Sequence, residues 1–372
     1  MLELGAFRSG LTYTRANRKL RHMLAAGSKV VPAPISDALY AEPVYSWKQI
    51  IEPVEPFLEA VSQRLAQQVQ SFHPDIAPYA DQALNGQGKH LRPALVALTG
   101  NALGKVTEPH ITVALIIEMV HLATLIHDDV MDEAEIRRGR LTLAASCGNE
   151  TAVLFGDCLF AQALKMAASF PTPEICRAVA MATNTVCSGE ILQTQHRRDF
   201  KFTRHQYFKV LEMKTAELFA LSGELSACLS QASAERRGAL RQFGLAFGTG
   251  YQVYDDCVDL FGSEAQAGKS LGTDLAKGKL TLPVLLAWER ASVADRAELQ
   301  EIVDGWKPSS MKQMAELLSK YDTLNSSLQS IHQYLEKARQ ILKTLPPSEG
   351  RSGLLGLTEH LARQTDELEV CA

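Results

Sequence analysis

The sequence from Glu118 to Thr142, EMVHLATLIHDDVMDEAEIRRGRLT, places an acidic cluster at the end of a long apolar run. Asp128 and Asp132 are four residues apart, so on a helix they share one face and their like charges repel. A magnesium ion would remove that repulsion, because it binds one or two carboxylates together with substrate phosphates. Arg137 and Arg138 follow, and a guanidinium binds phosphate oxygens bidentately. A solvated acidic helix end followed by a basic turn explains a single motif of this kind equally well.

A second copy of the motif favours the metal site. The stretch from Tyr251 to Lys279, YQVYDDCVDLFGSEAQAGKSLGTDLAKGK, again ends an apolar run in DDxxD and continues into basic residues, which are Lys269, Lys277 and Lys279. Two such helices that face each other would form a mouth lined by carboxylates and able to hold several magnesium ions. The basic residues around its rim would balance the charge of a bound diphosphate. Such a site is suited to breaking a carbon–oxygen bond to diphosphate by electrostatic stabilisation.

Two shorter motifs accompany the acidic stretches. GKHLRP at residues 88–93 lies upstream of both, and KTA at residues 214–216 lies between them. In this order and at these intervals, HDDVMDEAEIRRG and YQVYDDCVD resemble the trans-isoprenyl diphosphate synthase (polyprenyl synthetase) family, long-chain type, over about residues 50 to 370. The resemblance implies an all-α, single-domain helical bundle around a central cavity, the isoprenoid synthase fold, and a homodimer. It also implies a prenyltransferase that condenses isopentenyl diphosphate head-to-tail with an allylic diphosphate, using up to about three Mg2+ ions per site.

The same resemblance implies a role for each motif residue. The implied metal ligands are Asp128, Asp129, Asp132, Asp255, Asp256 and Asp259. The residues implied to act in catalysis are Asp128, Asp132, Asp255 and Lys214. Isopentenyl diphosphate would be bound by Lys89, Arg92, His121 and Arg138, and the allylic diphosphate by Arg137, Lys214, Thr215, Gln252, Lys269 and Lys279. The family usually has Gly-Gly-Lys-Arg-Leu-Arg where this chain carries Gln87 and His90, but Lys89 and Arg92 are retained.

The helix before the first aspartate motif carries a stripe of small and aliphatic residues, which are Ala123, Val120 and Ile116. In the family, these positions line a tunnel for the growing hydrocarbon, and a bulky aromatic residue at the position of Ala123 closes it. The small Ala123 therefore predicts a deep tunnel and a product of about twenty carbons or more. Ordinary helix packing of small residues is the alternative explanation.

Composition limits the remaining classes of function. The chain has 372 residues, 46% of them hydrophobic, and a net charge of −4, so nothing suggests a nucleic-acid partner. Seven scattered cysteines lack any metal-binding spacing, which indicates reduced thiols in a cytoplasmic protein. Residues 1–45 form a basic extension before the domain, which we expect at residues 46–372. An extra helix or disordered arm explains that extension best, and organelle targeting or membrane contact remains an alternative.

Apolar residues recur with helical period over residues 54–72, 112–133, 151–170, 204–229 and 234–261, which predicts an all-α fold. Glu190 and Gln193 share one side of a helix and are expected to support the rim of the cavity. Two rival functions use related chemistry. A class I terpene cyclase would lack the GKxxR motif, and a non-catalytic regulatory subunit of a prenyl synthase would tend to lose aspartates. The expected partners are the two diphosphate substrates and a second copy of the chain, with a peripheral membrane contact for product release as a further option.

Overall fold

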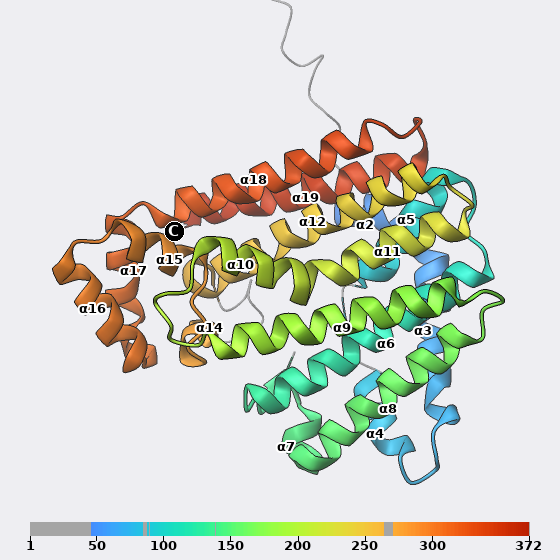
Figure 1. The fold of residues 1–372 in the computed structure, drawn as a ribbon, viewed down its shortest axis with the longest axis horizontal. Helices are drawn as coiled ribbons and strands as arrows, with labels where there is room; N and C mark the ends of the chain where they lie inside the picture. Colours follow the sequence, from blue (N-terminus) through green and yellow to red (C-terminus); the bar gives the residue numbers. More distant parts are fainter. Residues whose placement is uncertain (1–45, 85–87, 89, 138, 264–270, 372) are drawn as a thin grey trace, which may run out of the picture. The chain divides into compact units, whose positions relative to one another are not determined.

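The computed structural model describes residues 46–84, 88, 90–137, 139–263 and 271–371, and these form an almost wholly helical unit (Figure 1). The predicted basic extension at residues 1–45 and three predicted ligands, Lys89, Arg138 and Lys269, lie outside the described residues.

The first half of the described chain contains α2 (Trp47–Ile51), η2 (Glu52–Val54), α3 (Glu55–Gln68), η3 (Val69–Ser71), α4 (Ala77–Leu84), α5 (Leu91–Leu103), α6 (Glu108–Met131), β1 (Ile136–Arg137), β2 (Arg140–Leu141), α7 (Leu143–Cys147), α8 (Asn149–Ala168) and α9 (Pro173–Gln195). The second half contains α10 (Arg204–Leu211), η4 (Glu212–Ala216), α11 (Glu217–Leu229), α12 (Ala234–Phe261), α14 (Thr273–Ala276), α15 (Leu282–Arg290), α16 (Val293–Asp304), η5 (Pro308–Ser310), α17 (Met311–Lys320), α18 (Thr323–Leu342) and α19 (Glu349–Cys371). The all-α prediction is therefore confirmed.

The long helices begin where polar caps satisfy the first backbone N–H groups. The Ser233 hydroxyl accepts from the Arg236 N–H and starts α12, which ends at Phe261. Thr107 and His110 cap each other at the start of α6, and Pro109 is tolerated in the first turn, where its missing N–H costs nothing. These caps fix the two helices that carry the acidic motifs.

The core forms where α11 packs on α12, α12 on α18, and α6 on α8. Figure 1 shows α18 and α19 side by side, and both also pack against α12. Most of α6 is buried, including Val113, Ile117 and Met119, because helices cover it on several sides. By length and composition, two of the described helices could cross a membrane, α6 and α8, and α6 is the core helix of this unit.

Two local features depart from the predicted periodicity. Residues 204–229 do not form one continuous α-helix, because η4 is a π-helical turn between α10 and α11. The first acidic motif continues into an antiparallel pair of two-residue strands, in which Ile136 pairs with Leu141 and Arg137 with Arg140. Both features lie beside the residues that the sequence singles out, and π-turns occur frequently at functional sites.

Candidate active site

A chamber of about 1540 Å³ lies within the helical unit. The two acidic motifs reach it from different helices, because Asp128 and Asp132 stand at the end of α6, and Asp255 and Asp256 stand near the end of α12. The chamber is also lined by residues of α5, α9, η4, α10, α19 and the segment 273–281. The structure thus brings both clusters to one space, together with the predicted residues Arg92, His121, Asp129, Arg137, Lys214, Thr215, Gln252 and Lys279.

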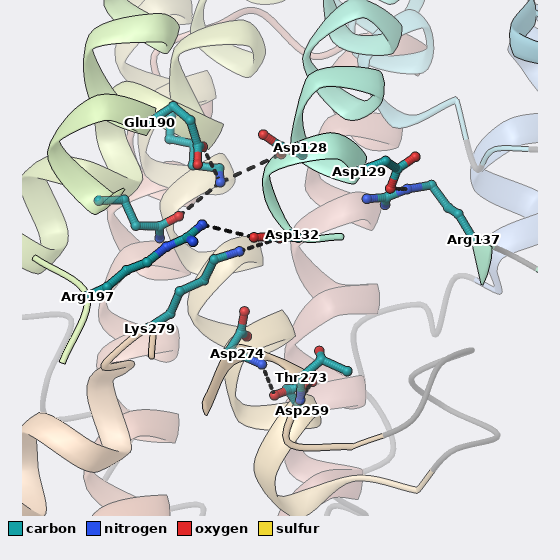
Figure 2. Close-up of polar contacts among 12 residues, drawn as sticks. Asp128, Asp129, Asp132, Arg137, Glu190, Arg197, Asp259, Thr273, Asp274 and Lys279 are labelled. Atoms are coloured by element: carbon teal, nitrogen blue, oxygen red, sulfur yellow. Dashed lines mark hydrogen bonds and ion pairs between the residues drawn. The ribbon is translucent and has the colours of Figure 1, made fainter. Parts of the chain in front are cut away.

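The first cluster is organised around Lys214, which projects from the π-turn. Its ammonium group forms an ion pair with Glu190, lies 3.6 Å from the Asp128 carboxylate and donates a hydrogen bond of 2.9 Å to Gln193 Oε1 (Figure 2). Helix α9 approaches the turn closely at Gly189, where an added Cβ would lie 2.7 Å from the Lys214 backbone nitrogen. Glu190 and Gln193 therefore position the lysine at the chamber, rather than only supporting a rim.

Charge is unevenly balanced along this cluster. Burial raises the pKa of Asp128 to about 6, and the Glu190 and Asp132 carboxylates add to the rise in spite of Lys214. Burial also acts to raise the pKa of Asp132, but Lys279, Lys214 and Arg197 outweigh it and lower that pKa. The folded chain thus disfavours the ionised form of Asp128 and favours that of Asp132.

Asp129, the middle aspartate of the first motif, contacts the strand pair β1–β2. Arg137 Nε donates a hydrogen bond of 2.7 Å to Asp129 Oδ1, which fixes β1 against the end of α6. Burial raises the pKa of Asp129 in spite of this arginine. Asp129 is therefore placed to orient Arg137 at the chamber wall.

The second cluster is held by a chain of hydrogen bonds that links three helical segments. Thr215 Oγ1 donates to Gln252 Oε1 over 3.0 Å, and Gln252 Nε2 donates to Asp256 Oδ1 over 2.8 Å. Tyr207 donates to the other Asp256 oxygen over 2.6 Å. Burial, followed by the nearby Asp274, raises the pKa of Asp256 well above its ordinary value. Asp256 therefore orients Gln252 and η4 in this structure.

Asp259 lies apart from the chamber lining and is completely buried. Its carboxylate accepts hydrogen bonds from the Thr273 hydroxyl, at 2.7 Å, and from the Asp274 backbone N–H, at 3.1 Å (Figure 2). Its carbonyl oxygen accepts from the Gly272 N–H, at 2.8 Å. Asp259, a predicted metal ligand, thus holds in place the start of the segment that leads to Lys279.

Near α5, Arg92 and His121 line the chamber around the buried carboxylate of Glu118. The Arg92 guanidinium lies over the Phe219 ring, 4.5 Å from its centroid. Burial alone would raise the pKa of Glu118, but the neighbouring His90, His121 and Arg92 hold it at about 2. The ionised carboxylate of Glu118 thus lies beside the Arg92 guanidinium and two imidazole rings.

The predicted tunnel residues lie in the packed core beside the chamber wall, so their role stays a prediction. Ala123, Val120 and Ile116 are completely buried in the core and do not line the chamber. Successive residues on an α-helix point about 100° apart, and the face toward the chamber carries Thr124 and His127 instead.

On that face, the His127 ring packs against Phe160 and donates to the Val153 carbonyl over 3.0 Å. It fits there because the facing position on α8 is Gly156, where a Cβ would lie 2.2 Å from His127 Nε2. The wall near the first motif is therefore built by His127, Thr124 and Phe160.

The structure ties three further residues to the site that belong to none of the sequence motifs. Arg197 pairs with Asp132 at 3.0 Å, Tyr207 donates a hydrogen bond to Asp256, and Glu118 lies beside Arg92 near α5. Only Glu118 gave a signal, since an acid in an apolar helix is rarely buried without partners. Arg197 and Tyr207 reach the site through tertiary contacts that no local pattern shows.

The side chains at the chamber fit a hard divalent cation. Their donors are carboxylate oxygens, which suit Mg2+. No three His, Cys, Asp or Glu side chains of the described residues form a ready-made metal-binding group. Magnesium commonly completes its coordination with substrate phosphates and water, so an open arrangement is compatible with it.

Comparison with known proteins agrees with this geometry. The family model for polyprenyl synthetase matches residues 73–321. The octaprenyl diphosphate synthase of Haemophilus influenzae is 31% identical over 310 residues, which cover 83% of this chain and 94% of that protein. A decaprenyl diphosphate synthase from Rhodobacter capsulatus has a similar structure, with a TM-score of 0.81, 29% identity and coverage of 86% of this chain and 99% of that one.

A polyprenyl synthase from Caulobacter crescentus, solved in complex with calcium and isoprenyl diphosphate, also has a TM-score of 0.81, at 28% identity and coverage of 86% and 98%. Sequence, fold and chamber therefore lead to one conclusion: this chain belongs to the polyprenyl synthetase family.

Proposed function

We propose that the chamber binds an allylic diphosphate and isopentenyl diphosphate and joins them head-to-tail into a trans-polyprenyl diphosphate. The chain is a prenyltransferase of the trans-polyprenyl diphosphate synthase class, as its relatives indicate. The observation that carries the proposal is that aspartates of both motifs, three from the first and Asp255 and Asp256 from the second, line one cavity with Lys214 and Lys279. Burying so many charges without a charged ligand would be costly for a fold alone.

Asp128, Asp132 and Asp255 are the residues proposed to hold magnesium, with Asp129, Asp256 and Asp259 orienting the groups around them. When bound, the metal would supply positive charge that stabilises the leaving diphosphate. The Caulobacter protein binds calcium and isoprenyl diphosphate, which supports a divalent metal at this kind of site.

The side chains proposed to bind diphosphate divide into two groups. Lys214 and Lys279, with Thr215, Gln252 and Arg137, are proposed to bind the allylic diphosphate, because they surround the acidic motifs. Arg92 and His121 lie near α5, where they are proposed to bind isopentenyl diphosphate. Lys89, Arg138 and Lys269 are assigned to the same two groups by resemblance alone.

Release of the allylic diphosphate leaves a carbocation, which the double bond of isopentenyl diphosphate attacks. Loss of a proton then completes the new double bond. The departing diphosphate is proposed to accept that proton. The apolar wall at Phe160 and Val186 would keep water from the cation.

Two alternatives are less well supported. A regulatory subunit would tend to lose aspartates, and all six remain in this chain. A terpene cyclase would not need the Arg92 and His121 group beside α5. Incubation with Mg2+, isopentenyl diphosphate and a labelled allylic primer separates these functions: elongated diphosphates support the proposal, cyclic hydrocarbon would indicate a cyclase, and absence of turnover would indicate a subunit.

The length of the product gives a specific prediction, for which Thr124 is the test residue. We expect Thr124→Phe to shorten the product by at least one isoprene unit, because the ring would enter the chamber beside His127 and Phe160. Ala123→Phe should instead destabilise the fold by about 1–3 kcal/mol, since Ala123 is packed in the core. Chromatographic sizing of the products and urea unfolding measure the two effects.

Thr124→Ser is the matched control and should leave both product length and stability unchanged. If Ala123→Phe shortened the product without loss of stability while Thr124→Phe did not, the wall assignment would be wrong.

We also propose that two copies associate through α8 and α9. Large apolar side chains outside the chamber lining are exposed on both helices, which are Leu154, Leu164 and Met181. Exposed apolar side chains can mark interaction sites, so a second copy is proposed to cover them. A cytoplasmic location, with a transient membrane contact during product release, remains an expectation from the sequence.

A further inference from the structure

At the chamber, a cation holds each of the two carboxylate oxygens of Asp132. Arg197 Nη2 lies 3.0 Å from Oδ1, and Lys279 Nζ lies 2.7 Å from Oδ2 (Figure 2). Asp132 is the C-terminal cap of α6, Arg197 follows α9, and Lys279 follows α14. Three segments that are distant in the sequence therefore meet at one carboxylate.

The two segments that carry the cations are bound to each other. The backbone N–H of Arg198 donates a hydrogen bond of 2.7 Å to the carbonyl of Gly278, which directly precedes Lys279. Arg198 adopts a left-handed φ of 57°, which is unfavourable for a side-chain-bearing residue. His196 stacks on Phe202, with ring centroids 4.7 Å apart, and so helps to order this loop. The two segments thus hold Arg197 and Lys279 together beside Asp132.

The charges around Asp132 do not favour binding of a metal ion in the absence of diphosphate. One carboxylate faces two cations, so a divalent cation that approaches Asp132 meets two positive charges at short range. A diphosphate would bring the negative charge that is missing. Arg197 is suited to receive it, because its Nε is buried and has no hydrogen-bond partner among the described residues, and a guanidinium binds phosphate in a forked geometry.

We propose that Arg197 is a further diphosphate-binding residue, and that Arg197 and Lys279 form a cation latch on Asp132. When diphosphate binds, Arg197 and Lys279 leave the Asp132 carboxylate and pair with the diphosphate oxygens. Magnesium therefore binds at Asp132 together with diphosphate and only weakly before it. This inference rests on the proposed function and adds to it a residue and an order of binding.

Isothermal titration calorimetry tests the latch with two probes, MgCl2 alone and inorganic diphosphate at fixed MgCl2. In Arg197→Gln, we expect Mg2+ alone to bind about tenfold more tightly, because the guanidinium that repels it is gone. Diphosphate should bind about tenfold more weakly, because the same guanidinium attracts it. Arg197→Lys should resemble the wild type with Mg2+ alone and fall between wild type and Arg197→Gln with diphosphate. Arg177→Gln removes the same charge from an exposed side chain of α9 outside the chamber lining and should bind both probes like the wild type.

Opposite shifts for the two probes support the latch, because general damage to the site would weaken both. Unchanged affinities in Arg197→Gln, or shifts of the same sign, would overturn it, provided that the unfolding midpoint of the variant matches that of Arg197→Lys. If Arg197→Gln has a lower unfolding midpoint, the diphosphate affinity of Arg197→Lys is compared with that of the wild type instead. Equal affinities of these two proteins would also overturn the latch. Failure of the wild-type protein to bind diphosphate in the presence of Mg2+ would instead contradict the proposed function itself.

Discussion

Replacement of Asp128 by asparagine is expected to lower the rate of chain elongation about 1,000-fold, because the variant loses charge stabilisation at the leaving diphosphate. The fold should tolerate the change. The raised pKa of Asp128, at about 6, means that the folded chain disfavours the ionised carboxylate, and asparagine has the same shape without the charge. Lys214 keeps its contacts with Glu190 and Gln193. Single-turnover elongation of a labelled allylic primer measures the rate, and urea unfolding measures the stability.

Asp304→Asn is the matched control for this variant, since Asp304 is exposed at the end of α16 and distant from the chamber lining. Its elongation rate should equal that of the wild type. An Asp128→Asn protein that elongates the primer at the wild-type rate would show that Asp128 has no part in the reaction.

Replacement of Lys214 by methionine is expected to reduce both stability and activity. Burial acts against the charged form of this lysine, but Asp128 and Glu190 raise its pKa, so the folded chain favours the ammonium ion. Its removal leaves two buried carboxylates without their partner, which is expected to lower the free energy of unfolding by about 3 kcal/mol. Chemical unfolding at neutral pH without metal measures this loss.

A second substitution separates the structural role of Lys214 from its role in catalysis. In Lys214→Met with Glu190→Gln, part of the lost stability should return, because one unpaired carboxylate is removed, whereas elongation should remain impaired. Lys312→Met, at an exposed lysine of α17, controls for the loss of a positive charge. Recovery of both stability and activity in the double variant would show that Lys214 serves only the fold.

The sequence was sufficient to predict the helices and the acidic motifs, because both are local patterns. Residues 234–261 were predicted as one helix and form α12, which starts at its Ser233 cap. The strand pair at Ile136–Leu141 was not predicted, since strands of two residues have no detectable period. The π-turn at Lys214 was missed for a related reason: one irregular turn does not interrupt the apolar spacing on either side of it.

The parts of the site that the sequence could not predict depend on packing between distant segments. Arg197 and Asp132 are separated by 65 positions, and Tyr207 and Asp256 by 49. The choice between Ala123 and Thr124 depends on a rotation of about 100° around α6, which is one residue step. The apolar spacing of α6 could not settle it, because this helix is buried on several sides.

Binding of diphosphate in the presence of Mg2+, measured by calorimetry for wild type, Asp128→Asn, Asp255→Asn and the double variant, tests most directly whether the two acidic clusters act as one site. Each single substitution should greatly weaken the binding, and the double variant should lose much less than the sum of the two single losses, because groups that hold the same ligand are not independent. Additive losses, or a single variant that binds like the wild type, would show that Asp128 and Asp255 belong to separate sites.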